Sequence, residues 1–461
     1  MAFVSLWFKT VNSMKVVKFG GSSVANAEQI SKIIDIVTAD ADRRIVVVSA
    51  PGKRHGDDAK VTDLLIALAT AVLNGENHES ALKAVVDRYA QIQHELALPK
   101  SVVETIEADL RGRIGSRGSN DLQFMDTMKA SGEDNNAKLI AEAFTKKGHP
   151  AKYINPGEAG MLLSDEFGNA EVLPESFEKL AALKGESDIV IFPGFFGSTK
   201  AGDVATFPRG GSDITGAILA AAVKAEVYEN FTDVDSVYAM DPRIVPNAPA
   251  IDLMTYREMR ELAYAGFGVF HDEAIIPAVK HEIPICIKNT NRPEAPGTLI
   301  VPERKYEQTE VAGISSADGF CAIYIDKYMM NREVGFGRRL LQILEDEEIS
   351  YEHTPSGIDN MSIILRSEEL GKKEKTVVER ITNELAPDAV SVEHGLALLM
   401  VVGEGMHYAV GQAAKATNAL AEHGVNIEMI NQGASEISMM FAVKEIDRKK
   451  AVLALGHAFF G

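Results

Sequence analysis

Strands and helices alternate through the first two thirds of the chain, and this alternation constrains the fold more than any other feature. One apolar run begins at Val16 and Val17, a second at residues 44–49 is dense in β-branched residues, and a third covers residues 188–192. Between the first two runs, apolar residues recur at helical spacing over residues 30–37. Strand, turn and helix in repeated succession predict a parallel sheet that is covered by helices on both faces.

Length, charge and cysteine content narrow the class of protein. A chain of 461 residues is too long for one ordinary core, so we expect two or three domains. The formal net charge of −19 argues against nucleic acid and anionic membrane as general partners. The two cysteines, Cys286 and Cys321, have no metal-like spacing and do not form a disulfide framework, which favours a cytoplasmic protein. No apolar run approaches the length of a membrane span.

The first strand ends in the sequence Lys18-Phe19-Gly20-Gly21-Ser22-Ser23. Two glycines allow the backbone to turn and a ligand to approach its amides, and the N-terminus of the following helix favours a phosphate. Lys18 adds a mobile positive charge. The spacing matches neither a Walker loop nor a dinucleotide fingerprint, so an ordinary strand-to-helix connection is the alternative.

Two further glycine-containing turns follow strands, at residues 193–197 and at Arg209-Gly210-Gly211-Ser212-Asp213. In an open parallel sheet such turns gather where ligands bind, and their charges suit phosphoryl transfer to an acidic acceptor. Arg209 is a candidate clamp for a carboxylate, with a surface ion pair as its alternative role. Asp213 is a candidate to orient Lys18 or the substrate, and helix capping is its alternative role.

Several other polar residues have a functional and an ordinary interpretation. Glu133, expected in the first turn of a helix over residues 133–146, is a candidate to bind an ammonium group, and Thr62 is a candidate N-cap or ligand. Thr232, Asp233 and Tyr238 follow a strand, where a nucleotide can lie. No His, Cys and carboxylate set has metal-ligand spacing, so we expect any metal to arrive with a nucleotide.

An internal repeat distinguishes the last third of the chain, after a charged linker near residues 303–310. A helix expected over residues 337–350 and a second over residues 411–426 each end in polar turn residues, before Ile349 and Val425 respectively. Each helix has one strand before it and others after it. Two such units in tandem predict a paired small-molecule sensing module, with generic α+β packing as the alternative.

The motifs at Lys18 and Arg209, together with Thr232-Asp233, Asp241-Pro242-Arg243 and Asn289-Thr290-Asn291, resemble in this order the signatures of aspartate kinases. The repeated tail resembles the ACT domains of that family. The resemblance implies an α/β fold: an amino-acid-kinase-type αβα sandwich with a mainly parallel sheet, followed by two α+β ferredoxin-like ACT domains. The expected parts are a leader or cloning remnant at 1–13, a catalytic domain at 14–302, a linker at 303–312, a first ACT domain at 313–394 completed by 446–461, and a second at 395–445.

The same resemblance implies an activity. It is the ATP-dependent phosphorylation of L-aspartate to 4-phospho-L-aspartate, the first step towards lysine, threonine, methionine and diaminopimelate. The implied cofactor is ATP with Mg²⁺ held mainly by the nucleotide. Feedback by lysine or threonine through the ACT domains and a homodimer or higher homo-oligomer are also implied. No dehydrogenase domain follows the tail, so we expect a monofunctional enzyme.

Site residues carry over from the family onto matching positions of this sequence. The catalytic group is Lys18, Arg209 and Asp213. The ATP-binding group is Lys18, Gly20, Gly21, Ser22, Thr232, Asp233, Tyr238 and Arg243. The aspartate-binding group is Ser49, Thr62, Glu133 and Arg209, with Arg209 on the α-carboxylate and Glu133 near the ammonium. The effector candidates are Met330, Tyr351, Glu352, Thr354, Ser356 and Asp359, for which loop packing is the alternative.

The sequence departs from the family pattern near His271. Gly268 stands where a lysine is common, and Asp272 stands where a proline usually follows the histidine, so we expect Arg243 to bear more of the nucleotide contact. The loop over residues 53–60 is longer than usual, so the match of Thr62 is gapped. Two other functions stay open: an amino-acid kinase acting on glutamate or its N-acyl derivative, and a catalytically weak effector sensor.

Overall fold

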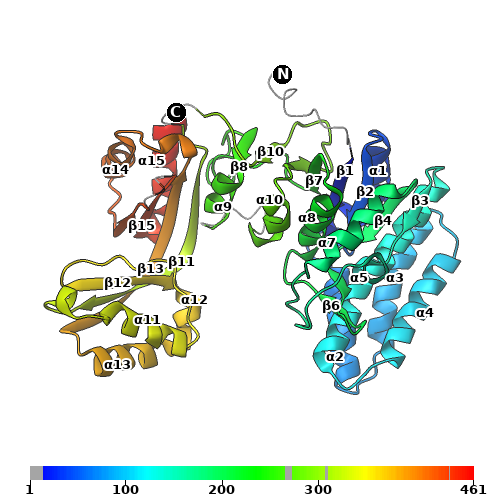
Figure 1. Cartoon of the computed structure of the whole chain (residues 1–461), viewed down its shortest axis with the longest axis horizontal. Helices are drawn as coiled ribbons and strands as arrows, with labels where there is room; N and C mark the ends of the chain where they lie inside the picture. The colour runs from blue at the N-terminus through cyan, green and yellow to red at the C-terminus, as the bar shows by residue number, and fades with distance from the viewer. Residues whose placement is uncertain (1–13, 265–271, 307–309, 434, 436) are drawn as a thin grey trace. The chain divides into compact units, whose positions relative to one another are not determined.

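The computed structural model describes residues 14–264, 272–306, 310–433, 435 and 437–461. The chain forms two compact units (Figure 1). The first comprises Met1–Val237, Ala250–Tyr256 and Val269–Arg304, and the second comprises Tyr238–Pro249, Arg257–Gly268 and Lys305–Gly461, in each case within the described residues. Two short segments that we expected in the catalytic domain at 14–302 therefore group with the tail.

An eight-stranded sheet forms the centre of the first unit, with the strand order β3-β4-β2-β1-β7-β9-β10-β8. All neighbouring strands are parallel except β9 and β10, which confirms the predicted mainly parallel sheet. The strands are β1 (Lys15–Phe19), β2 (Arg43–Val48), β3 (Ala151–Tyr153), β4 (Ile189–Pro193), β7 (Val227–Thr232), β8 (Leu253–Thr255), β9 (Ile285–Asn289) and β10 (Thr298–Val301), and the separate hairpin is β5 (Phe196–Ser198) with β6 (Val204–Thr206).

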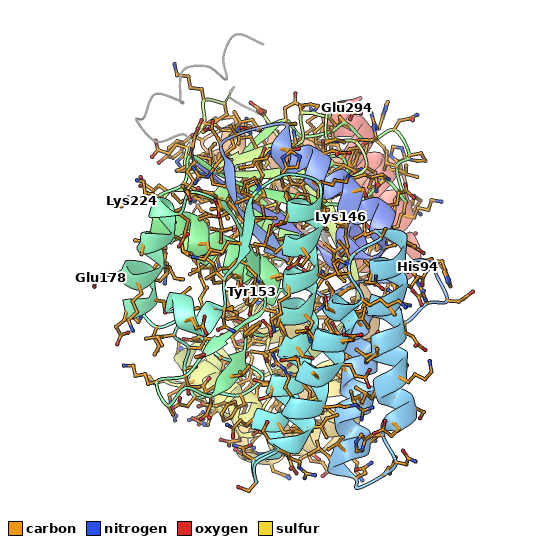
Figure 2. The ribbon with its side chains drawn as sticks, turned by 90° about the vertical axis from the view of Figure 1, so that its right-hand side faces the viewer. His94, Lys146, Tyr153, Glu178, Lys224 and Glu294 are labelled. Atoms are coloured by element: carbon orange, nitrogen blue, oxygen red, sulfur yellow. The ribbon has the colours of Figure 1, made fainter. Side chains whose placement is uncertain are left out.

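Helices cover this sheet because its central strands are apolar on both faces: Val16, Val17 and Phe19 are all fully buried. The helices are α1 (Ala27–Thr38), α2 (Val61–Leu73), α3 (Glu79–Glu95), α4 (Ser101–Gly115), α5 (Asp121–Lys146), α6 (Pro156–Ala159), α7 (Glu175–Leu180), α8 (Gly211–Val223) and α10 (Ile276–Lys280). Figure 2 shows the long helices α3, α4 and α5 side by side, with Lys146 near the end of α5. Its ammonium donates to the carbonyl of Leu96, 2.9 Å away.

Helix α5 begins earlier than the sequence indicated. Asn120 caps it by accepting hydrogen bonds from the backbone of Leu122 and Gln123, so Glu133 lies in the middle of the helix. The expectation that residues 131–133 start a helix was wrong. The glycine at 132 is not a helix boundary but a packing position, because a Cβ there would lie 2.9 Å from the Cβ of Ala50.

The second unit contains a five-stranded sheet with the order β12-β11-β13-β15-β14, antiparallel throughout. Its strands are β11 (Gly313–Asp326), β12 (Asn360–Arg366), β13 (Ala389–Val402), β14 (Met429–Asn431) and β15 (Ser438–Lys444). Its helices are α11 (Phe336–Asp346), α12 (Ser367–Leu370), α13 (Glu374–Leu385), α14 (Gln412–Glu422) and α15 (Arg448–Phe460), and most of α9 (Tyr256–Tyr264) also belongs to this unit.

Two separate cores lie along the paired strands β11 and β13. One is formed by the C-terminal half of β11 with α11 and α13, and includes Ile323, Leu340 and Ile381. The other is formed by the C-terminal half of β13 with α14 and α15, and includes Leu399 and Leu455. The two predicted ACT units are thus present, but both long strands pass through both of them.

The end of the chain does not complete the first ACT unit. We expected residues 446–461 to complete that unit, with residues 452–460 as its last strand, but Arg448–Phe460 is the helix α15. Its buried residues Ala451, Val452 and Leu455 recur at helical spacing and pack in the core of the second unit. The N-terminal half of β11 pairs instead with β13 beside that core, from Gly313 to Ala317.

In the described part of the chain, no helix is long and apolar enough to cross a membrane.

Candidate active site

A buried lysine and an aspartate meet at the end of β1. The Nζ of Lys18 lies 2.6 Å from Oδ1 of Asp213 and 3.4 Å from Oδ1 of Asn230, and the Nδ2 of Asn230 donates to the same carboxylate at 2.7 Å. Lys18 is 7% exposed. Asp213 is the third residue of α8, not its cap, so of its two predicted roles the structure supports the contact with Lys18.

Glycines at the ends of β1 and β2 bring two turns into backbone contact. The N–H of Gly52 donates to the carbonyl of Gly21 at 2.8 Å, and a Cβ on Gly52 would lie 2.6 Å from the carbonyl carbon of Gly21. A Cβ on Gly20 would lie 3.4 Å from the Nζ of Lys18. The turn therefore leaves space beside the lysine ammonium, and Ser22 after it is exposed.

Hydrogen bonds draw the ends of β1, β7 and β9 together. The hydroxyls of Ser23 and Thr290 share a hydrogen bond of 2.7 Å, and the N–H of Thr290 donates to the carbonyl of Thr232 at 2.9 Å. The hydroxyl of Thr232 in turn lies 3.2 Å from the carboxylate of the exposed Asp233. The sequence motifs at Lys18, Thr232 and Asn289 thus meet at one edge of the sheet, where ligands bind in open α/β sheets.

Arg209 lies just before α8, exposed, and has no ion pair or hydrogen bond with any described residue. The surface ion pair that we considered as its alternative role is therefore absent from this part of the chain. The turn around it is tightly packed, since a Cβ on Gly211 would lie 2.6 Å from the ring of Phe195. Gly210 has a φ of +84°, a backbone conformation that favours glycine.

Glu133 projects from α5 towards the turn after β2. It is 6% exposed, and its Oε2 has no hydrogen-bond partner among the described residues. Burial raises the pKa of Glu133 to about 8, and the backbone N–H of Ala50 opposes that rise. The nearby Tyr89 donates to the carbonyl of Gly132, and its pKa is raised well above the usual range by burial.

Ser49 lies at the start of the turn after β2, and Thr62 lies near this turn, since the N–H of the preceding Val61 donates to the carbonyl of Pro51 at 3.0 Å. Ser49 follows β2 directly and its N–H donates to the carbonyl of Phe19 at 3.2 Å. Thr62 is the second residue of α2, whose N-cap position is Lys60, so the prediction of Thr62 as N-cap was wrong. Both residues are partly exposed and can reach a ligand in this region.

Two predicted nucleotide contacts fall in the second unit. Tyr238 and Arg243 both belong to that unit, and Arg243 forms an ion pair of 2.8 Å with Asp241. Their part in nucleotide binding stays a prediction. Gly268 and His271 lie outside the described residues, as does the side chain of Asp272.

The effector candidates spread over different environments in the second unit. Met330 is 7% exposed and packs in the core of the first ACT unit, so it has the packing role that we considered as its alternative. Glu352 pairs with Arg366 at 3.3 Å and accepts from Tyr264, and Asp359 accepts from the backbone of Met329 at 2.7 Å. Tyr351 is exposed, and Thr354 is partly exposed.

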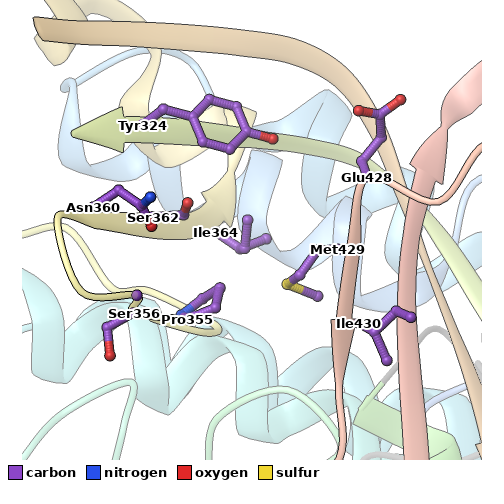
Figure 3. Close-up of a pocket in the computed structure, with 10 residues that line it drawn as sticks. Tyr324, Pro355, Ser356, Asn360, Ser362, Ile364, Glu428, Met429 and Ile430 are labelled. Atoms are coloured by element: carbon purple, nitrogen blue, oxygen red, sulfur yellow. The ribbon is translucent and has the colours of Figure 1, made fainter. Parts of the chain in front are cut away.

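A pocket of about 260 Å³ opens on the sheet face of the first ACT unit (Figure 3). Its walls come from both ACT units: Tyr324, Pro355, Ser356, Gly357, Asn360, Ser362 and Ile364 from the first, and Glu428, Met429 and Ile430 from the second. Figure 3 shows the hydroxyl end of the Tyr324 ring directed towards the carboxylate of Glu428. Burial and this carboxylate raise the pKa of Tyr324. Ser356 is the one effector candidate that lines this pocket.

Asn230 is a site residue that the sequence reasoning missed. It pairs with Lys18 in the register of β1 and β7, and it is 3% exposed. The available signal was the pair of polar residues, Glu229 and Asn230, inside the strand Val227–Thr232, because buried polar residues need partners. The missing information was the register, which no local pattern supplies.

Comparison with known proteins shows the family to which the chain belongs. Residues 13–289 match the family model described as the amino acid kinase family, and residues 399–459 match a model of the ACT domain. Aspartokinase 3 of Bacillus subtilis is 56% identical over 97% of this chain and 99% of its own length. The crystal structure of Clostridium acetobutylicum aspartate kinase is 36% identical, covers 97% of this chain and 99% of its own, and has a TM-score of 0.86. Escherichia coli aspartokinase III, in complex with aspartate and ADP, is 28% identical, with coverages of 97% and 100% and a TM-score of 0.77.

The chain is an amino acid kinase that carries ACT domains. Its mainly parallel sheet, with Lys18 near the end of the interior strand β1, and the matches to both family models define this class. Similarity to the Bacillus protein extends over both units and nearly the whole of both chains. Within that class, the chain belongs to the aspartokinases. The ACT match extends to residue 459, in agreement with the place of α15 in the second ACT unit.

Proposed function

We propose that this chain transfers the γ-phosphoryl group of ATP to the side-chain carboxylate of L-aspartate, giving ADP and 4-phospho-L-aspartate. Membership of the aspartokinases and the complex of the E. coli relative with aspartate and ADP support this reaction and nucleotide binding. The observation that carries the proposal is the buried Lys18 beside the open Gly20–Gly21 turn. In this function Lys18 stabilises negative charge that develops between ATP and the acceptor carboxylate.

The other residues divide between nucleotide and substrate. Gly20, Gly21 and Ser22 offer backbone and hydroxyl groups to the phosphates, while Thr232 and Asp233 bind the rest of the nucleotide. Asp213 holds the Lys18 ammonium in place through its contact of 2.6 Å. Ser49, Thr62, Glu133 and Arg209 bind aspartate. The Oε2 of Glu133 accepts from its ammonium and the guanidinium fork of Arg209 binds its α-carboxylate, and neither group has a partner among the described residues.

Magnesium fits this site as part of the nucleotide complex. Among the described residues, no group of three or more His, Cys, Asp or Glu side chains is placed to hold a metal ion. Mg²⁺ usually binds through one or two carboxylates together with substrate phosphates. When bound, it would supply charge neutralisation on the phosphates, and the chain itself would contribute Lys18 and the backbone amides of the turn.

One assay tests this function against its two alternatives. ADP release is measured with L-aspartate, with L-glutamate and without an acceptor, and hydroxylamine traps any acyl phosphate. We expect hydroxamate with aspartate. Hydroxamate with glutamate alone would identify a related amino-acid kinase, and none with either acceptor would favour a sensor without catalysis.

The KM for aspartate is expected to depend on pH through Glu133. The pKa of its carboxyl is raised to about 8 in the free enzyme, so it is neutral at lower pH and cannot pair with an ammonium. Each unit of pH below that value should raise the KM for aspartate by about tenfold, because only the ionised fraction binds. Steady-state kinetics between pH 6 and 9, run with Glu133→Gln, checks this: the variant should show a high KM without that slope. The same slope in the variant would assign the titration to another group.

The raised pKa of Glu133 also has a consequence for stability, with a definite sign. Between the ordinary pKa of a glutamate and about 8, the folded chain holds a proton that the unfolded chain has released. The contribution of the protonated Glu133 to the free energy of unfolding is therefore complete below the ordinary pKa of a glutamate, and it is lost as the pH rises to about 8. The free energy of unfolding of the Glu133→Gln variant should lack this dependence on pH.

The ACT units support feedback control by an amino acid. E. coli aspartokinase III, which is 28% identical with a TM-score of 0.77, has been crystallised with lysine and aspartate. Lysine is therefore the first effector to titrate, followed by threonine and methionine, in the hydroxamate assay. Paired ACT units also favour a homodimer or a higher homo-oligomer, which sedimentation can measure.

A further inference from the structure

A single peptide bond at the proposed aspartate site, between Ser49 and Ala50, is held by a side chain of α5. The Nδ2 of Asn136 donates to the carbonyl of Ser49 at 2.7 Å, and the N–H of Ala50 is near enough to Glu133 to lower the pKa of its carboxyl. The Ser49 carbonyl and the Ala50 N–H are the two polar groups of the same peptide bond. Residues three apart lie on one face of a helix, so α5 can present the side chains of Glu133 and Asn136 to that peptide at once.

Hydrogen bonds between strands do not fix the orientation of the Ser49–Ala50 peptide. The N–H of Ser49 makes the last bond of the ladder, to the carbonyl of Phe19, and Pro51 follows with no N–H to donate. Among the described residues, the N–H of Ala50 has no backbone partner. A proline also restricts the residue before it to extended conformations, which narrows the choices open to Ala50. The orientation of this peptide therefore depends on the side chains of α5.

We propose that Asn136 is a positioning residue for the aspartate site, acting through the Ser49–Ala50 peptide on both Ser49 and Glu133. The inference rests on the proposed function, in which those two residues bind aspartate. Asn136 is fully buried, so it reaches the substrate through the peptide and not by its own contact. Without its donor, the carbonyl of Ser49 is unpaired and the peptide can rotate. Rotation would move the Ser49 hydroxyl and change the position of the Ala50 N–H relative to Glu133.

Asn135 provides a matched control on the same helix. It is the same residue type and fully buried, and its Oδ1 has no partner among the described residues, as is the case for Asn136. Its Nδ2 donates instead to Asp109, 2.9 Å away and on α4. Replacing either asparagine by leucine therefore removes one buried side-chain hydrogen bond, but only Asn136→Leu frees the Ser49–Ala50 peptide.

The test compares kcat, the separate KM values for aspartate and ATP, and the thermal midpoint of the full chain carrying Asn136→Leu, Asn136→Ser or Asn135→Leu. For Asn136→Leu we expect the KM for aspartate to rise about tenfold, the order of one lost hydrogen bond, with the KM for ATP unchanged. Asn136→Ser keeps a donor and should be intermediate. Asn135→Leu should lower the thermal midpoint to a similar degree and leave both KM values unchanged.

Three results would bear against the proposal or its basis. An unchanged KM for aspartate in folded Asn136→Leu, or an equal rise in Asn135→Leu, would overturn the positioning role. If Asn136→Leu does not fold, Asn136→Ser decides the question in the same way, by whether its KM for aspartate rises. Absence of any acyl phosphate from aspartate in the wild-type protein would instead refute the proposed function, and is seen before any variant is made.

Discussion

Replacing Lys18 by methionine should lower kcat by about a thousandfold, the scale seen when one preorganised donor to a developing charge is lost. The methionine keeps the length and the apolar stem of the side chain but removes the ammonium that lies 2.6 Å from Asp213. Asp213 keeps the hydrogen bond from Asn230, so its carboxylate is not left without a partner. The folded structure should therefore persist, and the loss should appear in turnover measured by ADP release at saturating substrates.

Lys15 provides the control for this experiment. It lies on the same strand and forms a similar pair, with Asp40 at 2.8 Å, at the opposite end of β1 from the glycine turn. Lys15→Met removes one lysine–aspartate pair without touching the site, so kcat should stay near the wild-type value. Near-normal turnover in Lys18→Met, with a thermal midpoint like that of the control, would refute an electrostatic role for Lys18.

Replacing Arg209 by alanine should raise the KM for aspartate by about 10- to 100-fold, the range for one or two charge-assisted hydrogen bonds. In the described part of the chain Arg209 has no partner to lose, so the thermal midpoint should not change. Arg209→Lys keeps the charge but loses the planar fork, and should fall between alanine and wild type. Initial rates at varied aspartate and fixed, saturating ATP give this comparison.

Lys200 is a suitable control for charge alone. It is a surface cation beyond the hairpin strand β5 and pairs with Glu175 at 2.9 Å. If Lys200→Ala raises the KM for aspartate as much as Arg209→Ala, the effect comes from the general field of the surface and not from a specific clamp. A KM for aspartate that is unchanged in Arg209→Ala would remove Arg209 from the substrate site.

Local patterns were sufficient to predict most of the fold. The glycine turn after β1 and the β-branched strands indicated a parallel sheet because both faces of such strands are buried. The internal repeat is present in backbone detail: Gly335 and Gly411 precede α11 and α14 with φ of +81° and +91°, and Glu348 and Gly424 end the following turns with φ of +52° and +63°. These equivalent positions have the same spacing as Ile349 and Val425.

Tertiary context decided what the patterns could not. We expected a helix to start at residues 131–133, yet residues 121–132 already belong to α5, in which Ala130 is buried and Gly132 packs closely against Ala50. The apolar run at 452–460 suits a strand or a helix by composition, and burial of one helical face in the second ACT core selected the helix. Asn136 and Asn230 act through contacts with residues far away in sequence, which a single sequence does not reveal.

The two long strands shared by the ACT cores impose an order on folding. When β11 leaves the ribosome, its C-terminal half can form the first core with α11, β12 and α13. Its N-terminal half must wait for the distal half of β13, and the second core closes only after α15 has emerged. Until then, apolar residues such as Ile314 and Leu399 are exposed on unfinished strands, a state in which chains pair wrongly with their neighbours. We therefore expect the second ACT unit to be open to wrong strand pairing until the whole of α15 has been synthesised.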